Sequence, residues 1–455
     1  MRIVILGAGP TGLGAGYRLS ELGHDDWTIY EASGHVGGLA ASHRDALGFT
    51  YDIGGHVLFS HYPYFTEVFD RLMGEDVTVL ERESWIRMMG RYVPYPFQNN
   101  IRHLPPEVTL ECLSGLIRAQ RELDPSAVAD FESWIFAQFG EGIARHFMLP
   151  YNFKVWAHPP SEMSKRWIAE RVSLIDVDHL LGNVVLGRDD LSWGPNSTFK
   201  FPLYGGTGGF YERVRPYVAD RLQLNRRAAG IDPRRKIVRF EDGSETEYDV
   251  LLSTMPVNLL ARMVEGLPAR AVEAAGRLSW TGGLFVGIGV ARPAPTSKCW
   301  LYFPEESAPF YRVTYLSNYS PFIAPDADHH LLLTETSHSP YKPENPATIV
   351  ARTIDGLIAT GILDESDRQR IVTTDLTQIA YSYPVPTLER DAALGAIQPE
   401  LMGRDIYSRG RFGAWLYEIG NMDHSFMQGV EFVDHALSGE KETVWYPTVS
   451  PAAVH

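Results

Sequence analysis

The sequence predicts an α/β fold in which a Rossmann-like dinucleotide-binding domain is interleaved with a helical domain and an antiparallel β-sheet domain. Three observations predict this fold: a glycine-rich turn between a strand and a helix at the N-terminus, helical stripes of apolar residues after residue 100, and a series of short strand patterns after residue 280. A chain of 455 residues is long enough for two or three such units.

The composition narrows the function classes. Hydrophobic residues make up 44% of the chain and charged residues 21%, as in a globular protein. The net charge is −15, so we expect no nucleic-acid partner. Only Cys112 and Cys299 are cysteines, so we expect no disulfide framework, no metal site and a reducing, cytoplasmic location. No apolar run approaches about 18 residues, so we expect no membrane span.

The first element is a buried parallel strand over Ile3–Leu6, followed by a helix that ends near Leu22. Three glycines in the turn between them have separate physical roles. Gly7 permits the tight turn, Gly9 lets backbone N–H groups approach a pyrophosphate, and Gly12 lets the helix pack closely on the strand.

A second strand, Trp27–Tyr30, ends at Glu31. A carboxylate at this place accepts hydrogen bonds from both ribose hydroxyls and repels a 2′-phosphate. The pattern therefore predicts a site for FAD or NAD rather than NADP.

A second glycine-rich turn follows Glu31 and contains Gly37, Gly38 and Leu39. Near the other end of the chain, a polar segment precedes a helix expected over Met427–Leu437; its candidate cofactor residues are Arg411, Gly420, Asn421, Asp423 and Ser425. This arrangement resembles the flavoproteins related to amine oxidases and phytoene desaturases, in which FAD lies along both glycine turns. The two ends together indicate FAD.

The middle of the chain changes character. Apolar stripes over 108–117 and 131–139 predict two helices, the second capped by Asp130, and a third stripe is expected to end before Pro150.

Further along, a hairpin with its turn at Asp242-Gly243 and a run ending at Leu252 returns the chain to the nucleotide domain. Strands are expected over 284–290, 300–303, 313–317 and 331–336, and a helix is expected over 345–357.

These elements suggest interleaved domains. We expect an FAD-binding domain built from 1–60, 203–265 and 385–455. A helical domain covers 100–200, and an antiparallel-sheet substrate domain is built from 61–99 and 266–384.

Several segments are rich in aromatic residues, arginine and asparagine without the spacing that core packing imposes. They are 54–62, 92–100, 150–156, 193–196, and 311–312 together with 317–320. With the two ends of the chain, they resemble the UDP-galactopyranose mutases, in particular the eukaryotic-type branch, from about residue 3 to about residue 447.

The resemblance implies an isomerase. It implies interconversion of UDP-galactopyranose and UDP-galactofuranose by ring contraction with no net oxidation, with N5 of reduced FAD acting as nucleophile on the anomeric carbon. NADPH or NADH would be the reductant, with Arg87 and Arg411 near its site.

The resemblance also implies roles for individual residues. Arg171 and Arg312 would hold the diphosphate, while the loop with Gly55 and His56 would move with the flavin redox state. Further phosphate contacts would come from Tyr319, Tyr383, Tyr417 and Asn421. The uracil would meet Tyr95, Phe97, Gln98, Asn152 and Tyr302. The sugar and flavin side would be lined by Trp156, Asn196 and Trp300.

Physical chemistry agrees with part of this assignment. Arg312 lies in an apolar strand, where an unpaired arginine is costly, so we expect either a ligand or a buried partner. Arg171 follows Glu170 on an expected helix, so a surface ion pair explains it equally well.

Alternatives stay open at this point. Leu416 replaces an arginine expected from fungal members, and a long C-terminal extension is missing, which leaves substrate and homo-oligomeric state open. The same chemistry on UDP-arabinopyranose, UDP-N-acetylgalactosamine or a GDP-sugar is one alternative. An oxidoreductase of the amine oxidase or desaturase type and a non-enzymatic binder like the GDP dissociation inhibitors are two others.

Overall fold

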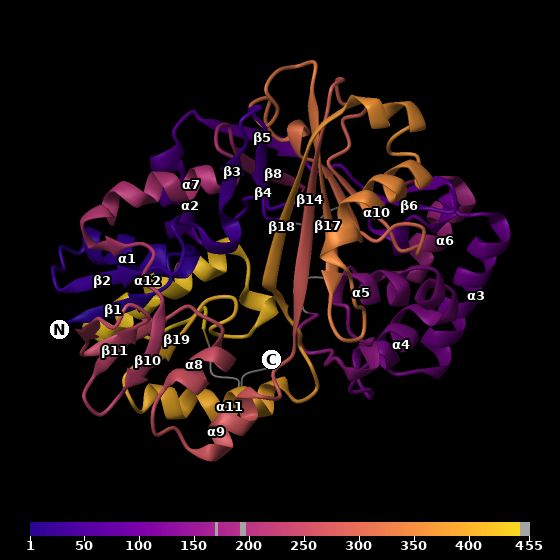
Figure 1. The fold of residues 1–455 in the computed structure, drawn as a ribbon. Coiled ribbons are helices and arrows are strands. Elements are labelled where there is room, and N and C mark those ends of the chain that lie inside the picture. The colour runs from indigo at the N-terminus through magenta and orange to yellow at the C-terminus, as the bar shows by residue number, and fades with distance from the viewer. Residues whose placement is uncertain (169–171, 192–196, 446–455) are drawn as a thin grey trace.

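The computed structural model describes residues 1–168, 172–191 and 197–445 (Figure 1). The nucleotide-binding unit contains a five-stranded, all-parallel sheet in the order β19-β13-β1-β2-β9. Its strands are β1 (Ile3–Leu6), β2 (Trp27–Tyr30), β9 (Leu222–Gln223), β13 (Val250–Ser253) and β19 (Ile406–Ser408). Strands from widely separated parts of the chain therefore share one sheet, which confirms the interleaved α/β fold.

The expected hairpin before residue 253 differs in detail. β11 (Ile237–Phe240) pairs with β10 (Ala228–Asp232) and with β12 (Glu245–Glu247), in a separate three-stranded sheet. The run ending at Leu252 is thus two strands, because the chain leaves β12 and enters the parallel sheet as β13 beside β1.

A seven-stranded sheet stands between the nucleotide-binding unit and the helices at the right of Figure 1, with strand order β18-β14-β17-β16-β15-β6-β7. Its strands are β6 (Ser84–Met88), β7 (Arg91–Pro94), β14 (Trp280–Val290), β15 (Trp300–Tyr302), β16 (Arg312–Tyr315), β17 (His330–His338) and β18 (Ile371–Pro384). The expected antiparallel sheet is present, with one parallel pair between β6 and β15.

The helical region contains α3 (Pro106–Glu122) and α4 (Phe131–Ile143). The Asp130 side chain caps α4 by accepting a hydrogen bond from the Ser133 N–H at 2.8 Å. The third stripe does not end before Pro150: a π-helical turn (Ala144–Met148) leads into α5 (Leu149–Trp156). Proline in the first turn of a helix is tolerated.

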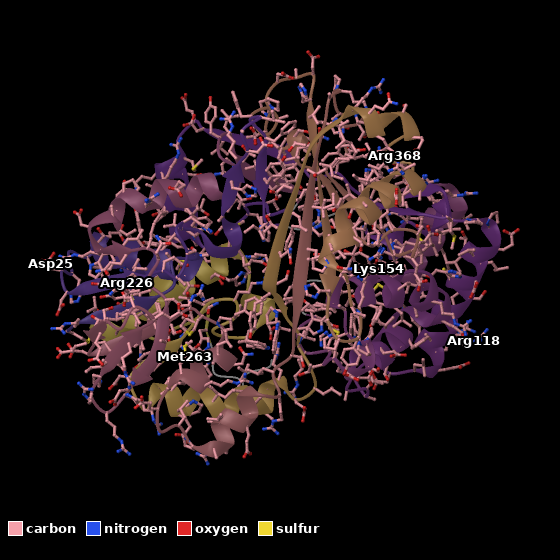
Figure 2. The ribbon with its side chains drawn as sticks, viewed as in Figure 1. Asp25, Arg118, Lys154, Arg226, Met263 and Arg368 are labelled. Atoms are coloured by element: carbon pink, nitrogen blue, oxygen red, sulfur yellow. The ribbon has the colours of Figure 1, made fainter. Side chains whose placement is uncertain are left out.

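Lys154 joins α5 to the large sheet (Figure 2). Its ammonium group is buried and donates hydrogen bonds to the carbonyls of Glu305 (2.8 Å) and Ala308 (2.9 Å), in the connection from β15 to β16. Burial lowers the pKa of Lys154 to about 7. The lysine therefore fastens the loop that leads to Arg312.

The remaining elements cover the sheets. The remaining strands form two antiparallel pairs. β3 (Ser42–Arg44) and β4 (Thr50–Asp52) form a hairpin, and β5 (Val77–Glu81) pairs with β8 (Thr198–Pro202) from a distant part of the chain. The longer helices are α1 (Pro10–Glu21), α2 (Pro63–Met73), α6 (Val177–Leu186), α10 (Pro346–Ala359), α11 (Arg390–Met402) and α12 (Met422–Ser438). Across the described ranges, every helix is too short or too polar to cross a membrane.

Candidate active site

The two glycine turns lie in contact with each other. Gly7 has φ +108°, and a Cβ atom on Gly12 would lie 1.9 Å from the Gly7 carbonyl oxygen, so neither position accepts a side chain without a shift. Gly38 has φ +55°, and a Cβ there would lie 3.2 Å from the Cα of Gly9. The Gly37 N–H donates to the Ala8 carbonyl at 2.9 Å. Backbone N–H groups are thereby concentrated around the start of α1, as a pyrophosphate requires.

Glu31 lies beside this turn, as predicted, but its carboxylate already has partners. Oε2 accepts from the Ala8 N–H and Oε1 from the Ser33 N–H, each at 2.7 Å. A carboxylate has about four acceptor positions, so capacity for ribose hydroxyls remains.

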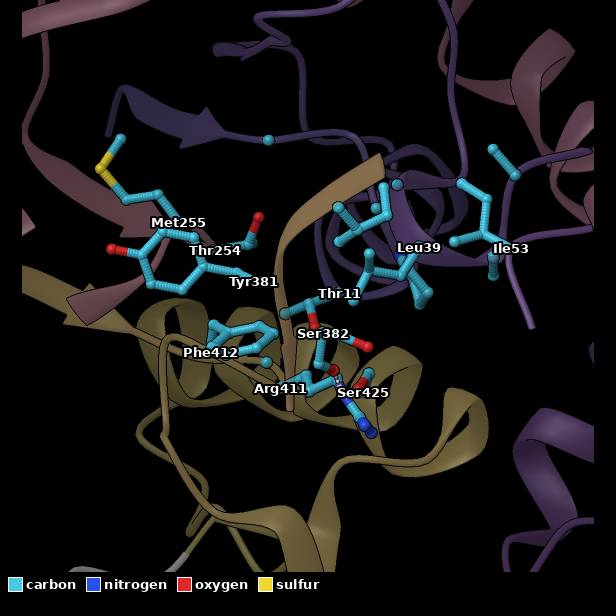
Figure 3. Close-up of a pocket in the computed structure, with 18 of the residues that line it drawn as sticks. Thr11, Leu39, Ile53, Thr254, Met255, Tyr381, Ser382, Arg411, Phe412 and Ser425 are labelled. Carbon is cyan, nitrogen blue, oxygen red and sulfur yellow. Dashed lines mark hydrogen bonds between the residues drawn. The ribbon is translucent and has the colours of Figure 1, made fainter. Parts of the chain in front are cut away.

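A cavity of about 1440 Å³ extends from these turns to the large sheet. It brings together most of the predicted cofactor residues and six further residues predicted for substrate binding or catalysis. The first group is Gly7, Gly9, Glu31, Gly38, Leu39, Arg411, Gly420, Asn421, Asp423 and Ser425; the second is Gly55, His56, Trp300, Arg312, Tyr383 and Tyr417. In Figure 3, Met255 and Tyr381 lie at one end of the labelled set and Ile53 at the other, with Thr11 between them. An elongated cavity with a glycine cradle at one end fits an extended dinucleotide.

The late polar segment is more helical than expected, because α12 begins at Met422 rather than at Met427. Asn421 occupies the position before the helix, and Asp423 and Ser425 lie in its first turns. The Asp423 carboxylate accepts from the His61 N–H at 3.2 Å, and the Nδ1 atoms of His61 and His424 each lie 3.0 Å from it. Asp423 thus ties the loop after β4 to the start of α12.

That loop carries Gly55 and His56 into the cavity. Gly54 has φ +97°, and a Cβ on Gly55 would lie 2.6 Å from the Thr314 hydroxyl and 2.9 Å from the Trp300 indole nitrogen. Only glycine fits at position 55 without displacing these groups.

His56 is neutral at physiological pH. Burial lowers its pKa to about 4, although the nearby Glu335 carboxylate opposes this effect, and the positive charges of Arg411 and Arg312 reinforce it. Its Nδ1 atom has no hydrogen-bond partner among the described residues.

We therefore expect stability to fall as pH falls through the window between the unfolded pKa of 6.5 and the folded value of about 4, since the unfolded state binds the extra proton there. In the wild type, the unfolding free energy should fall by up to about 3 kcal/mol across this window because of His56, and His56→Asn should remove this fall. Urea unfolding between these pH values measures it, with the exposed His179→Asn as control. An unchanged slope in His56→Asn would show that His56 is protonated in the folded protein.

Arg312 has a buried partner that the sequence reading did not name. Its Nε donates to Oε1 of Glu335 at 2.6 Å and its Nη2 to Oε2 at 2.8 Å. Burial acts against both charges, but the pairing outweighs it, so the pKa of Glu335 lies below its usual value and that of Arg312 above. The sequence feature that could have indicated this partner is Glu335, an acid within the apolar strand pattern 331–336. In the structure, Glu335 lies opposite Arg312 in the strand register.

A group of aromatic rings lies beside Arg312. The Trp156 ring centroid lies 5.6 Å from that of Tyr383 and 4.8 Å from that of Tyr417. The Arg411 guanidinium lies 4.9 Å from the Tyr383 ring centroid and 5.5 Å from that of Tyr417, and Nη1 donates to the Gly420 carbonyl at 3.1 Å. Aromatic rings around a charged centre exclude water and can stack on planar ligand groups.

The residues expected at uracil have protein contacts in this structure and do not line the cavity described above. The ring centroids of Tyr95 and Tyr302 lie 5.4 Å apart, and Phe97, fully buried, stacks on Phe147 at 4.5 Å. The side chains of Gln98 and Asn152 donate to backbone carbonyls of Ser173 (2.6 Å) and Met148 (2.7 Å).

The other predicted positions divide into two groups. Tyr319 is buried, with a hydroxyl that has no partner among the described residues. Arg171 and Asn196 lie outside the described residues. The ligand contacts assigned to all of these side chains stay predictions.

Comparisons with known proteins agree with this geometry. A family model described as flavin containing amine oxidoreductase matches residues 10–398. A crystal structure of reduced UDP-galactopyranose mutase matches with a TM-score of 0.94 and 46% sequence identity, covering 97% of this chain and 97% of that one.

More distant proteins share parts of the sequence or the fold alone. The 15-cis-phytoene desaturases of Synechococcus elongatus (37% identity over 76 residues) and Glycine max (32% over 120 residues) align with 17% and 26% of this chain, and with only 16% and 20% of their own lengths. Cyclohexylamine oxidase from Brevibacterium oxydans has a TM-score of 0.66 at 15% identity, covering 94% of this chain and 97% of that one, which shows a common fold. The family model covers most of the chain, and the mutase is 46% identical to it over 97% of its length. The chain therefore belongs to the flavin-containing amine oxidoreductase family and, within it, to the UDP-galactopyranose mutase group of FAD enzymes.

Proposed function

We propose that the protein interconverts UDP-galactopyranose and UDP-galactofuranose by ring contraction without net oxidation. The observation that carries this proposal is the position of Arg312, a cation whose side chain is only 18% exposed and which lines the cofactor cavity together with the Gly55 loop. A guanidinium in such a place can bind the phosphates of a diphosphate through charge-assisted, bidentate hydrogen bonds. The mutase that matches this chain at 46% identity supports the choice of sugar.

The residues present fit FAD. Gly7, Gly9, Gly12 and the turn at Gly37 and Gly38 would hold the pyrophosphate, and Glu31 the ribose. When bound and reduced, FAD would supply N5 as the nucleophile toward the anomeric carbon. Oxidised FAD would not supply this nucleophile.

The protein side chains would hold and orient the nucleotide. Arg312 would bind the diphosphate by charge, with Arg171 as its expected counterpart, and the hydroxyls of Tyr383 and Tyr417 would donate to the phosphates together with Tyr319 and Asn421. Burial raises the pKa of Tyr383, so this phenol stays a neutral donor at physiological pH. The Tyr311 and Tyr383 hydroxyls lie 3.3 Å apart, and the Tyr311 hydroxyl donates to Glu335, the partner of Arg312, so Tyr383 belongs to the same polar group.

Trp156 and Trp300, both buried, would shield the sugar from water, and Tyr95, Phe97, Gln98, Asn152 and Tyr302 would contact the uracil after local rearrangement. The reductant would be NADPH or NADH, near Arg411 and Arg87. A cytoplasmic location is supported by the two cysteines, which are both free.

Turnover of a panel of nucleotide sugars by dithionite-reduced protein tests this proposal. We expect UDP-galactofuranose to be converted to the pyranose, with UDP-arabinopyranose, UDP-N-acetylgalactosamine and GDP-sugars slower. Preference for another nucleotide sugar would correct the substrate alone. Hydrogen peroxide formed from amines, with no sugar isomerised, would replace the mutase by an oxidase.

A further inference from the structure

Glu335, a carboxylate on β17, holds three groups of the site at once. It is 1% exposed and accepts four hydrogen bonds, two on each oxygen. Oε1 accepts from Arg312 Nε at 2.6 Å and from the Gly55 N–H at 3.0 Å. Oε2 accepts from Arg312 Nη2 and from the Tyr311 hydroxyl, both at 2.8 Å. All acceptor positions of the carboxylate are therefore occupied.

The pairing with Glu335 orients the Arg312 guanidinium without using all of its hydrogen-bond donors. A guanidinium has five N–H donors in one plane, and Glu335 uses one on Nε and one on Nη2. The remaining donors make no hydrogen bond to any residue that the structure describes, and Arg312 lines the cavity. A ligand phosphate that draws on these donors changes how strongly the guanidinium holds Oε1.

Gly55 depends on the same oxygen. Its N–H is held by Oε1 of Glu335, and it is flanked by two buried polar groups that have no partner among the described residues, the Thr314 hydroxyl and the Trp300 indole N–H. The peptide at Gly55 therefore has an alternative set of partners within a few ångströms. Which set it uses depends on how well Oε1 accepts its N–H.

We propose that Glu335 is a positioning residue that couples diphosphate binding at Arg312 to the orientation of the Gly55 loop at the flavin. Because one carboxylate oxygen serves both groups, a ligand on Arg312 and a change of the loop must influence each other, and the influence is reciprocal by thermodynamic linkage. This inference rests on the proposed function only in that Arg312 binds a diphosphate and the loop faces FAD.

The affinity for UDP in the two flavin oxidation states tests the coupling. We expect UDP to bind the wild-type holoenzyme with dissociation constants that differ by about fivefold or more between oxidised and dithionite-reduced protein. We also expect UDP to shift the flavin midpoint potential correspondingly. In Glu335→Gln both differences should largely vanish, because the amide cannot accept on both sides and no longer holds the guanidinium by charge.

Asp367→Asn is the matched control. Asp367 is 1% exposed and pairs with Arg292 through two hydrogen bonds of 2.9 Å, away from the cavity. Its loss should lower stability in the same way but leave both UDP differences at wild-type values. If the glutamine variant does not fold, Glu335→Asp replaces it in the test. This variant keeps the charge but has a shorter side chain, so it should lose most of the coupling and still bind UDP.

The outcomes separate the two levels of inference. Equal UDP affinity in both oxidation states of the wild type, or full coupling in the Glu335 variants, would overturn the role of Glu335 and leave the mutase proposal intact. Failure of the wild type to bind UDP at all would overturn the proposed function itself.

Discussion

Arg312→Ala is expected to produce the largest combined loss of UDP affinity and stability of any single substitution in this site. The lost charge-assisted contact is about 1.5–3 kcal/mol, or roughly ten- to a hundredfold in the UDP dissociation constant. The variant also leaves Glu335 buried without its counter-ion, which costs about 3–5 kcal/mol of unfolding free energy. Titration with UDP and urea unfolding measure the two effects separately.

A double variant distinguishes binding from folding. Arg312→Met combined with Glu335→Leu removes both charges, so much of the stability should return while UDP affinity stays low. Unchanged UDP affinity in Arg312→Ala would show that this arginine is structural and that the diphosphate binds elsewhere.

Gly12→Ala is expected to abolish most flavin binding. The added methyl would lie 1.9 Å from the Gly7 carbonyl oxygen and 3.3 Å from the Ile5 side chain, so α1 must move away from β1. This movement opens the turn whose N–H groups would hold the pyrophosphate. The ratio of flavin to protein absorbance in freshly purified protein measures the loss.

Gly182→Ala is the control for the glycine substitution. Gly182 lies inside α6 with no atom within 4 Å of an added Cβ, so alanine should be neutral or stabilise the helix by up to about 1 kcal/mol. Flavin content near that of the wild type in Gly12→Ala would mean that the first glycine turn is not the pyrophosphate site.

The parts of the site that the sequence predicts best are local. The strand, the turn with Gly7 and Gly12, and the helix are predicted from residues that are close together in the sequence. The structure has β1, α1 and β2 where this pattern places them. Asp130 caps its helix as predicted for the same reason, since a cap acts on backbone N–H groups two or three residues away.

The features that the sequence did not predict depend on how strands from distant parts of the chain pair. Glu335 faces Arg312 only because β16 and β17 pair antiparallel with these residues opposite, which no local pattern specifies. The parallel pairing of β6 with β15 likewise joins segments that are far apart in the chain. The early start of α12 was hidden because Asn421, Asp423 and Ser425 suit both a polar loop and a helix N-terminus.

The central claim is a flavin reaction with no net redox change, and the number of products formed per reducing equivalent tests it most directly. The oxidised holoenzyme should be inactive, and a single stoichiometric reduction by dithionite or NADPH under anaerobic conditions should support many turnovers of UDP-galactofuranose, because the sugar leaves at its original oxidation level. Activity with oxidised flavin, or one reductant consumed for each product, would contradict the account.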